Sequence, residues 1–124
     1  MLKHPIQLLR HGLLWLGFAL IAGSASADDN LAIIDQNGNV NIANINQAAS
    51  QNTAIVEQFG SNNVLNQTQL GIANYLHGYQ QGSGNVLEQY QEGNGNFADI
   101  GQIGNNNTFD AFVCCATIKS VGPT

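Results

Sequence analysis

The chain has 124 residues, of which only 9% are charged, and its formal net charge is −5. With only three lysines and arginines, it lacks the basic patches that bind nucleic acid phosphates or anionic membranes, so neither is expected as a partner. Asn, Gln and Gly are abundant, a composition that by itself would also permit a disordered, aggregation-prone chain.

Residues 1–27 have the pattern of a secretory signal peptide and not of a folded element. A basic start with Lys3 and Arg10 precedes an apolar run over residues 13–22, and Ala25, Ser26 and Ala27 provide small residues for cleavage. The apolar run is about half of the roughly twenty residues that a membrane-spanning helix needs. We therefore expect cleavage after Ala27 and export of residues 28–124, with no membrane span in the mature chain.

The region from residue 28 to residue 112 consists of an eleven-residue repeat with no insertion or deletion. Each unit begins with Gln, has Gly two residues later in all but one unit, and has Asn five residues after the Gln. The Gln positions are Gln36, Gln47, Gln58, Gln69, Gln80, Gln91 and Gln102. The Asn positions are Asn30, Asn41, Asn52, Asn63, Asn74, Asn85, Asn96 and Asn107. The Gly positions are Gly38, Gly60, Gly71, Gly82, Gly93 and Gly104, with Ala49 in the remaining unit.

Within each unit, the Asn, an apolar position, a mixed position and the next Gln are spaced by two residues. This spacing places their side chains on one face of a β-strand. An eleven-residue period also suits a right-handed helical coil, but a glycine in every unit would weaken such a helix by about 1 kcal/mol each time. The Gly and the two residues after it predict a turn, which leaves a strand of about six residues.

These features predict an all-β fold, a β-solenoid or cross-β stack of strand–turn–strand rungs. Two eleven-residue units form one 22-residue rung, so each residue stacks on its equivalent 22 positions along the chain. A buried amide without a partner costs several kcal/mol, and a stack of identical amides avoids that cost. One inner column should contain Leu65, Leu87 and Phe109, and His77 should lie beside Asp99 on the outer face.

The repeat begins almost at the start of the mature chain, with no obvious capping element before it. Solenoids without caps leave unpaired backbone at the edges of their first and last rungs. Such an edge can pair with another copy, and repeated head-to-tail addition gives an open fibre. The sequence therefore predicts a self-assembling chain.

The pattern Q-x-G-x-x-N-x-A-x-x-x-Q resembles the curlin repeat of bacterial curli subunits. Gln36, Gly38, Asn41, Ala43 and Gln47 match it position by position. The likeness covers approximately residues 30–112. It differs in that the Asn position is uniformly Asn, where the family's major subunit often alternates with Ser, and in a very short stretch between signal and repeat.

This resemblance implies a structural subunit of extracellular amyloid fibres in the biofilm matrix of a Gram-negative cell, supporting adhesion and cell aggregation. It implies export through the periplasm and an outer-membrane secretion channel, with periplasmic helpers and other curli-type subunits as partners. The alternative is a minor, nucleating subunit or an accessory adhesin that anchors or binds fibres at the cell surface. In that reading, exposed Tyr75, Tyr79, Tyr90 and Phe97 would bind polysaccharide.

Residues 113–124 do not follow the repeat and are interpreted as a C-terminal tail. The tail holds Cys114 and Cys115, the only cysteines of the chain. Export would allow their oxidation, and the options are intermolecular disulfides, free thiols or a rare vicinal bridge, because adjacent cysteines bridge only with strain.

No catalytic residue, metal site or cofactor is expected, and the chain is interpreted as a protein that is not an enzyme. His77 is the single histidine after residue 27, with no orienting partner other than Asp99. A calcium-binding β-roll needs Asp in each turn, and the turns from Gly38 onward contain none. An ice-binding solenoid needs a flat array of Thr, and Thr53, Thr68 and Thr108 fall in different columns.

Overall fold

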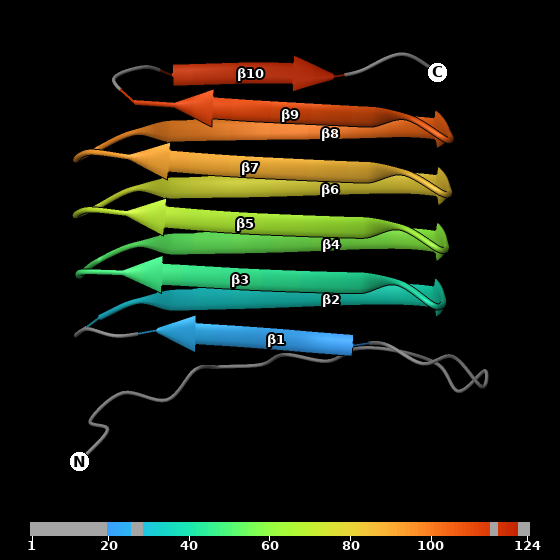
Figure 1. Cartoon of the computed structure of the whole chain (residues 1–124), viewed down its shortest axis with the longest axis horizontal. Coiled ribbons are helices and arrows are strands. Elements are labelled where there is room, and N and C mark those ends of the chain that lie inside the picture. The colour runs from blue at the N-terminus through green and yellow to red at the C-terminus, as the bar shows by residue number, and fades with distance from the viewer. Residues whose placement is uncertain (1–19, 26–28, 115–116, 122–124) are drawn as a thin grey trace.

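The computed structural model describes residues 20–25, 29–114 and 117–121, and the side chains of residues 29–114. Every regular element in the described residues is a β-strand (Figure 1). The strands are β1 (Leu20–Ala25), β2 (Leu31–Asn39), β3 (Ile42–Ala48), β4 (Thr53–Ser61), β5 (Val64–Leu70), β6 (Tyr75–Ser83), β7 (Val86–Glu92), β8 (Phe97–Asn105), β9 (Thr108–Val113) and β10 (Thr117–Val121).

The strands form two sheets, each composed of parallel strands, that pack face to face around the core. Sheet A has the order β1-β3-β5-β7-β9, and sheet B has the order β10-β8-β6-β4-β2. From β2 to β9, each residue pairs with the residue 22 positions further along, as in Leu65↔Leu87 and Gln58↔Gln80. The predicted fold is therefore confirmed: the chain is a β-solenoid of four full rungs, each built from two eleven-residue units.

Strands β2 to β8 are longer than the expected six residues, and the two sheets differ. Strands β2, β4, β6 and β8 have nine residues, whereas β3, β5 and β7 have seven. The nine-residue strands continue through the repeat glycine, and adjacent turns at the ends of both sheets bond to each other. For example, Asn62 N donates to Asn39 O at 2.9 Å. The turns are therefore part of the stack, which the sequence pattern did not predict.

The repeat glycines occupy backbone conformations that side chains rarely adopt. Gly38, Gly60 and Gly82 have φ values of 123°, 117° and 122°. A Cβ atom on Gly82 would lie 1.9 Å from the carbonyl oxygen of Gly104 in the next rung. Glycine is required here both for its positive φ and for the close stacking of successive turns.

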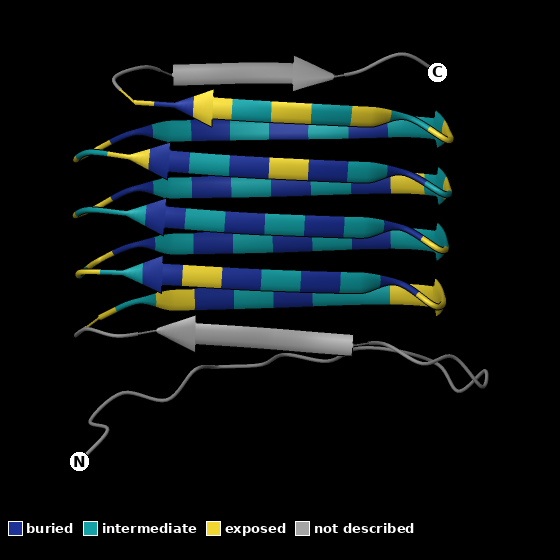
Figure 2. Ribbon diagram, in the orientation of Figure 1, coloured by how far each residue is buried: buried dark blue, intermediate teal, exposed yellow. Residues whose placement is uncertain are grey.

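The interior is a narrow core in which apolar and amide side chains alternate. Figure 2 shows buried and less buried residues alternating along every strand from β3 to β8. Ala43, Leu65 and Leu87 form the predicted apolar column with 0% exposure, and Phe109 continues it at the last rung, where it is only partly buried. Each sheet thus covers the inner face of the other, and the core consists of columns that run along the stack.

Candidate functional site

The Gln side chains form continuous hydrogen-bonded columns inside the solenoid. In sheet B, Gln36 Nε2 donates to Gln58 Oε1 at 2.5 Å, and the same bond repeats from Gln58 to Gln80 at 2.8 Å and from Gln80 to Gln102 at 2.9 Å. In sheet A, Gln47 donates to Gln69 at 2.9 Å and Gln69 to Gln91 at 3.1 Å. All donors point toward the later rung, so each column has a direction.

Each Gln amide also connects the two sheets. Gln58 Nε2 donates to Ile42 O at 3.0 Å, and Gln80 Nε2 donates to Val64 O at 3.0 Å. An amide in the middle of these columns therefore donates twice and accepts once, which satisfies most of the hydrogen-bonding capacity of a buried Gln. A hydroxyl or a shorter amide would not span both distances, so the geometry favours Gln at these positions.

The repeat Asn side chains hold the turns of successive rungs together. Asn63 Oδ1 accepts from Asn85 N at 3.1 Å, and Asn63 Nδ2 donates to Gly82 O at 3.0 Å. The same two bonds recur for Asn41, whose partners are Asn63 N and Gly60 O. Because one side chain must both accept and donate in fixed directions, Asn suits this position and a smaller hydroxyl would lose one bond.

Two further Gln residues lie in the core that sequence analysis had assigned only to a mixed column. Gln67 Nε2 donates to Gln89 Oε1 at 2.8 Å and to Ile55 O at 3.0 Å, and Gln89 Nε2 donates to His77 O at 3.0 Å. Gly78 faces them, and a Cβ atom there would lie 2.6 Å from Gln89 Oε1. The signal in the sequence was one glycine in an apolar column opposite two glutamines spaced by 22 residues.

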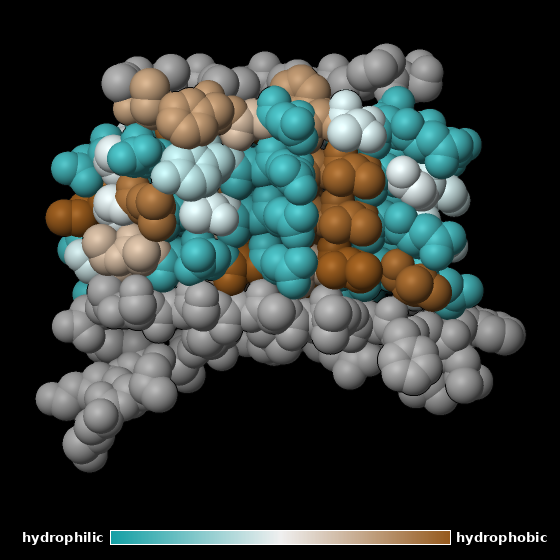
Figure 3. All heavy atoms as spheres, viewed as in Figure 1, coloured by the Kyte–Doolittle hydropathy of each residue, from teal (hydrophilic) through white to brown (hydrophobic). Residues whose placement is uncertain are grey.

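The outer faces carry stacked columns of like side chains. Figure 3 shows adjacent hydrophobic and hydrophilic bands that cross the strands of sheet A. The pairing places Ile42, Val64 and Val86 in one such column, and its neighbour contains Asn44, Asn66, Glu88 and Asp110.

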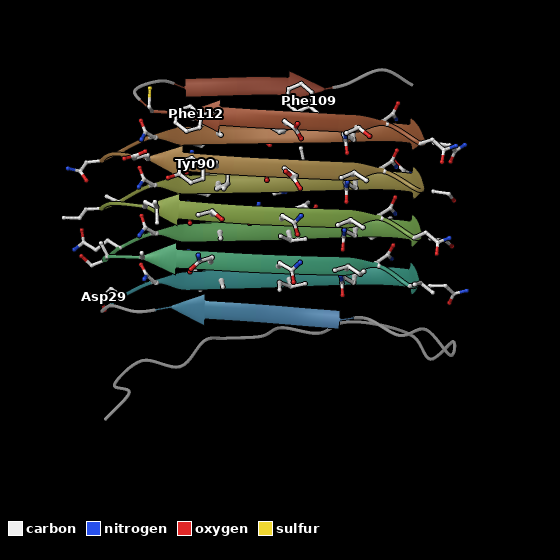
Figure 4. The ribbon with its side chains drawn as sticks, in the orientation of Figure 1. Asp29, Tyr90, Phe109 and Phe112 are labelled. Carbon is white, nitrogen blue, oxygen red and sulfur yellow. The ribbon has the colours of Figure 1, made fainter. Side chains whose placement is uncertain are left out.

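Aromatic rings also stack between rungs on the outer faces. The rings of Tyr75 and Phe97 are parallel within 4° at a centroid distance of 4.8 Å, and those of Tyr90 and Phe112 lie 5.1 Å apart. Figure 4 shows the last two rings one above the other on β7 and β9. Desolvation and the nearby Glu92 carboxylate raise the pKa of Tyr90. These ring pairs add side-chain packing between successive rungs.

His77 lies between two carboxylates on the outer face of sheet B. Its Nδ1 is 2.9 Å from Asp99 Oδ1, as the 22-residue register predicted, and its Nε2 is 3.8 Å from Glu57 Oε2, an ion-pair distance beyond hydrogen bonding. In the part of the chain that the structure describes, no three His, Cys, Asp or Glu residues are grouped closely enough to hold a metal ion. That part also contains no helix long and apolar enough to cross a membrane.

The ends of the stack differ from its middle. At the first full rung, β1 pairs with β3 over six residues, while the described residues place no strand beyond β2. The amide oxygen Oε1 of Gln36 is buried there and has no hydrogen-bond partner. At the last full rung, β10 pairs with β8 over five residues, and the described residues place no strand beyond β9.

Several predicted features fall partly or wholly outside the described residues. The proposed signal peptide is described only over residues 20–25, where the backbone forms β1, and its cleavage site at Ala27 lies outside. Cys114 is exposed, and Cys115 lies outside the described residues. The boundaries of the signal peptide, repeat region and tail remain predictions.

A comparison with protein families found matches to the curlin associated repeat over residues 27–60 and 90–111. Searches of curated proteins and of solved structures gave no match. The two matched stretches include the first rung and most of the last, and the structure joins them through an unbroken 22-residue register in both sheets. The chain therefore carries curlin associated repeats in both of these stretches.

Proposed function

We propose that this chain is a structural subunit of extracellular curli-like amyloid fibres that support a biofilm matrix, surface adhesion and cell aggregation. The observation that carries the proposal is the direction of the Gln columns. The column in sheet B begins at a buried acceptor without a partner, Gln36 Oε1. It ends at Gln102, whose Nε2 has a single described acceptor, Val86 O, whereas Gln58 and Gln80 each donate twice.

A second copy placed on the last rung would join these two ends. Gln102 Nε2 of one copy would donate to Gln36 Oε1 of the next, and the 4.8 Å spacing of the ladder would continue across the junction. Because every copy would add in the same orientation, the contact is head-to-tail and generates an open, polar fibre. Such a fibre consists of cross-β structure throughout and needs no catalytic site, so we propose that the protein is not an enzyme.

The proposed route follows from the family and from the leader pattern. Residues 1–27 would direct the chain across the inner membrane of a Gram-negative cell and would then be removed. Residues 28–112 would form the repeat solenoid, and residues 113–124 the tail. An outer-membrane secretion channel, periplasmic helpers and other curli-type subunits would be the partners before and during assembly at the cell surface.

A nucleating or accessory subunit that anchors fibres or acts as an adhesin is the second candidate. The observation in its favour is the last rung, where Phe112 is 62% exposed and β10 departs from the repeat register. An exposed ring stacked on Tyr90 beside the carboxylates of Glu88 and Asp110 offers a surface for a partner that the inner rungs do not offer.

The test is a Thioflavin T time course on residues 28–124, freshly diluted from denaturant, followed by fibre diffraction. A lag, a rise and reflections near 4.8 and 10 Å are expected for a fibre subunit, and a very short lag would favour the nucleating role. A soluble monomeric β protein with no rise would contradict self-assembly and leave the adhesin.

A matched pair of proline variants separates stacking from folding. Leu31 N donates to Asn52 O within the solenoid, so the pleat turns the N–H group of the next residue, Ala32, away from β4. Ala32→Pro should therefore block addition of a preceding copy while the monomer still folds, since proline is tolerated at a sheet edge. Leu31→Pro removes an internal bond and should weaken the monomer itself.

A further inference from the structure

Strand β10 pairs with sheet B in a register that differs from the rest of the solenoid. In the pairs β2–β4, β4–β6 and β6–β8, nine residues match partners 22 positions away. In contrast, β10 matches only five residues of β8, and Thr117 lies opposite Phe97, which is 20 positions away. Strand β10 is therefore shifted by two residues against the repeat.

The shifted register leaves part of β8 without a described partner strand. The pairing covers Phe97–Gly101, so β10 does not reach residues 102–105 of the nine-residue strand. This uncovered part contains Gln102, the last member of the Gln column in sheet B. The residues that follow β10 in the sequence, Gly122 and Pro123, have no amide side chain that could extend the column, and proline has no N–H group.

Strand β2 of a second copy fits the same edge better than β10 does. It has nine residues, and stacking in the repeat register would place Leu31 opposite Phe97 and Gln36 opposite Gln102. Its Gln36 Oε1 is a buried acceptor without a partner. Strand β10 therefore makes five described pairs with the edge of β8, whereas β2 of a second copy would make nine.

We propose that β10 is a removable cap on the growing end of the fibre, displaced by β2 of the incoming copy. The incoming residues 36–39 pair first with the uncovered residues 102–105, and pairing then extends toward Phe97 as β10 leaves. This inference rests on the proposed function, since it needs a second copy that stacks head-to-tail. It adds a specific step that slows growth until displacement occurs.

The first experiment compares seeded elongation of the unaltered chain with that of a chain ending at Cys114, each prepared as the full chain and from residue 28, under reducing conditions. Without β10, elongation at one fibre end should be about tenfold faster, because a barrier lowered by roughly one net hydrogen bond changes a rate by that factor. A chain in which residues 115–124 are replaced by an equally long Gly/Ser segment should behave like the truncated chain.

The opposite variant, Gly122→Gln with Pro123→Thr, gives the tail an amide side chain and a backbone N–H group with which to prolong its pairing, and it should slow elongation. Ile72→Ser, an exposed change in the turn between β5 and β6, is the control and should leave the rate unaltered. If the unaltered chain forms fibres but truncation leaves elongation unchanged or slows it, the cap is refuted while the proposed function stands. If neither chain forms fibres, the proposed function fails and the cap with it.

The length that each subunit adds along the fibre axis is an independent test of whether β10 leaves. If β10 leaves, each subunit adds four rungs, or about 19 Å at a spacing of 4.8 Å. If β10 stays, each subunit adds a fifth level, or about 24 Å. Mass per unit length of the fibre distinguishes the two values, and the larger one would overturn the inference.

Discussion

The Gln side chains in the middle of the columns make three hydrogen bonds each, and their identity matters more than their polarity. Gln80 accepts from Gln58 at 2.8 Å and donates to Gln102 at 2.9 Å and to Val64 O at 3.0 Å. Removal of one amide therefore leaves neighbouring groups unsatisfied in the buried core, and an unsatisfied buried group costs about 1–3 kcal/mol.

Replacing Gln80 by Leu should lower the free energy of unfolding by about 3 kcal/mol or more, because three polar groups lose a partner. Gln81→Leu is the matched control, since Gln81 is adjacent but exposed, and it should change stability by less than about 1 kcal/mol. The denaturant midpoint of freshly diluted protein measures both. Equal effects would mean that the columns do not stabilise the core.

Gly78 should tolerate no side chain while Gln89 is present. A Cβ atom at residue 78 would lie 2.6 Å from Gln89 Oε1 and 2.7 Å from Leu65 Cδ1, so Gly78→Ala should cost about 1–3 kcal/mol. Gly101→Ala is the control, because its Cβ would meet only Tyr79 Cδ1 at 3.8 Å. In a double-mutant cycle, Gln89→Ala should reduce the cost of Gly78→Ala; additive effects would contradict this packing.

At the scale of elements, strands and turns form a single stack. The turn after β4 bonds to the turn after β2 through Asn62 N and Asn39 O, and the turn after β7 bonds to that after β5 through Gly93 N and Leu70 O, both at 2.9 Å. The turns contain residues with positive φ. Val40 adopts such a conformation, with a φ of 56°, although its side chain is branched at Cβ.

Gly82→Ala should destabilise the solenoid by more than about 2 kcal/mol, because its Cβ would strike the Gly104 carbonyl and φ of 122° excludes side chains. Gly95→Ala serves as the comparison, since its φ is 68° and no atom lies within 4 Å of its Cβ position. That change should cost about 1 kcal/mol. Thermal unfolding followed by circular dichroism ranks the two, and a similar loss in both would refute the role of close turn stacking.

At the scale of the whole molecule, the two ends of the stack decide whether it grows. Strand β1 covers the edge of β3 over Leu20–Ala25, within the segment that we propose is removed as a signal peptide. Loss of that segment would leave both strands of the first rung open. The full-length chain would therefore present one blocked end until it is processed.

We expect the full-length chain to polymerise several-fold more slowly than residues 28–124. The cause is the backbone pairing between β1 and β3, which an incoming copy would have to displace. Ala22→Pro in the full-length chain keeps the leader but interrupts β1, and it should restore part of the rate in light-scattering kinetics. A leader that slows assembly equally with and without the proline would point to a cause other than edge pairing.

The sequence alone determined the fold class, the 22-residue rung and the registers of the Gln, Asn and Gly columns, because an uninterrupted period of eleven with alternation of two leaves few ways to bury one face. The columns containing Leu65 and Leu87, and the proximity of His77 to Asp99, followed directly from that spacing. The difference in strand length between the sheets did not follow, since all units share nearly the same pattern and only the structure shows where each strand ends.

Only the tertiary structure decided which buried polar side chains have hydrogen-bond partners. The pairing of Gln67 and Gln89 opposite Gly78 depends on which residues of the two sheets face each other across the core. The unpartnered oxygen of Gln36 and the shifted register of β10 are properties of the ends, where the repeat has no neighbour to define its partner. A periodic sequence fixes the interior of a stack because every rung has equivalent neighbours, whereas its ends depend on local residues and on the chain that meets them.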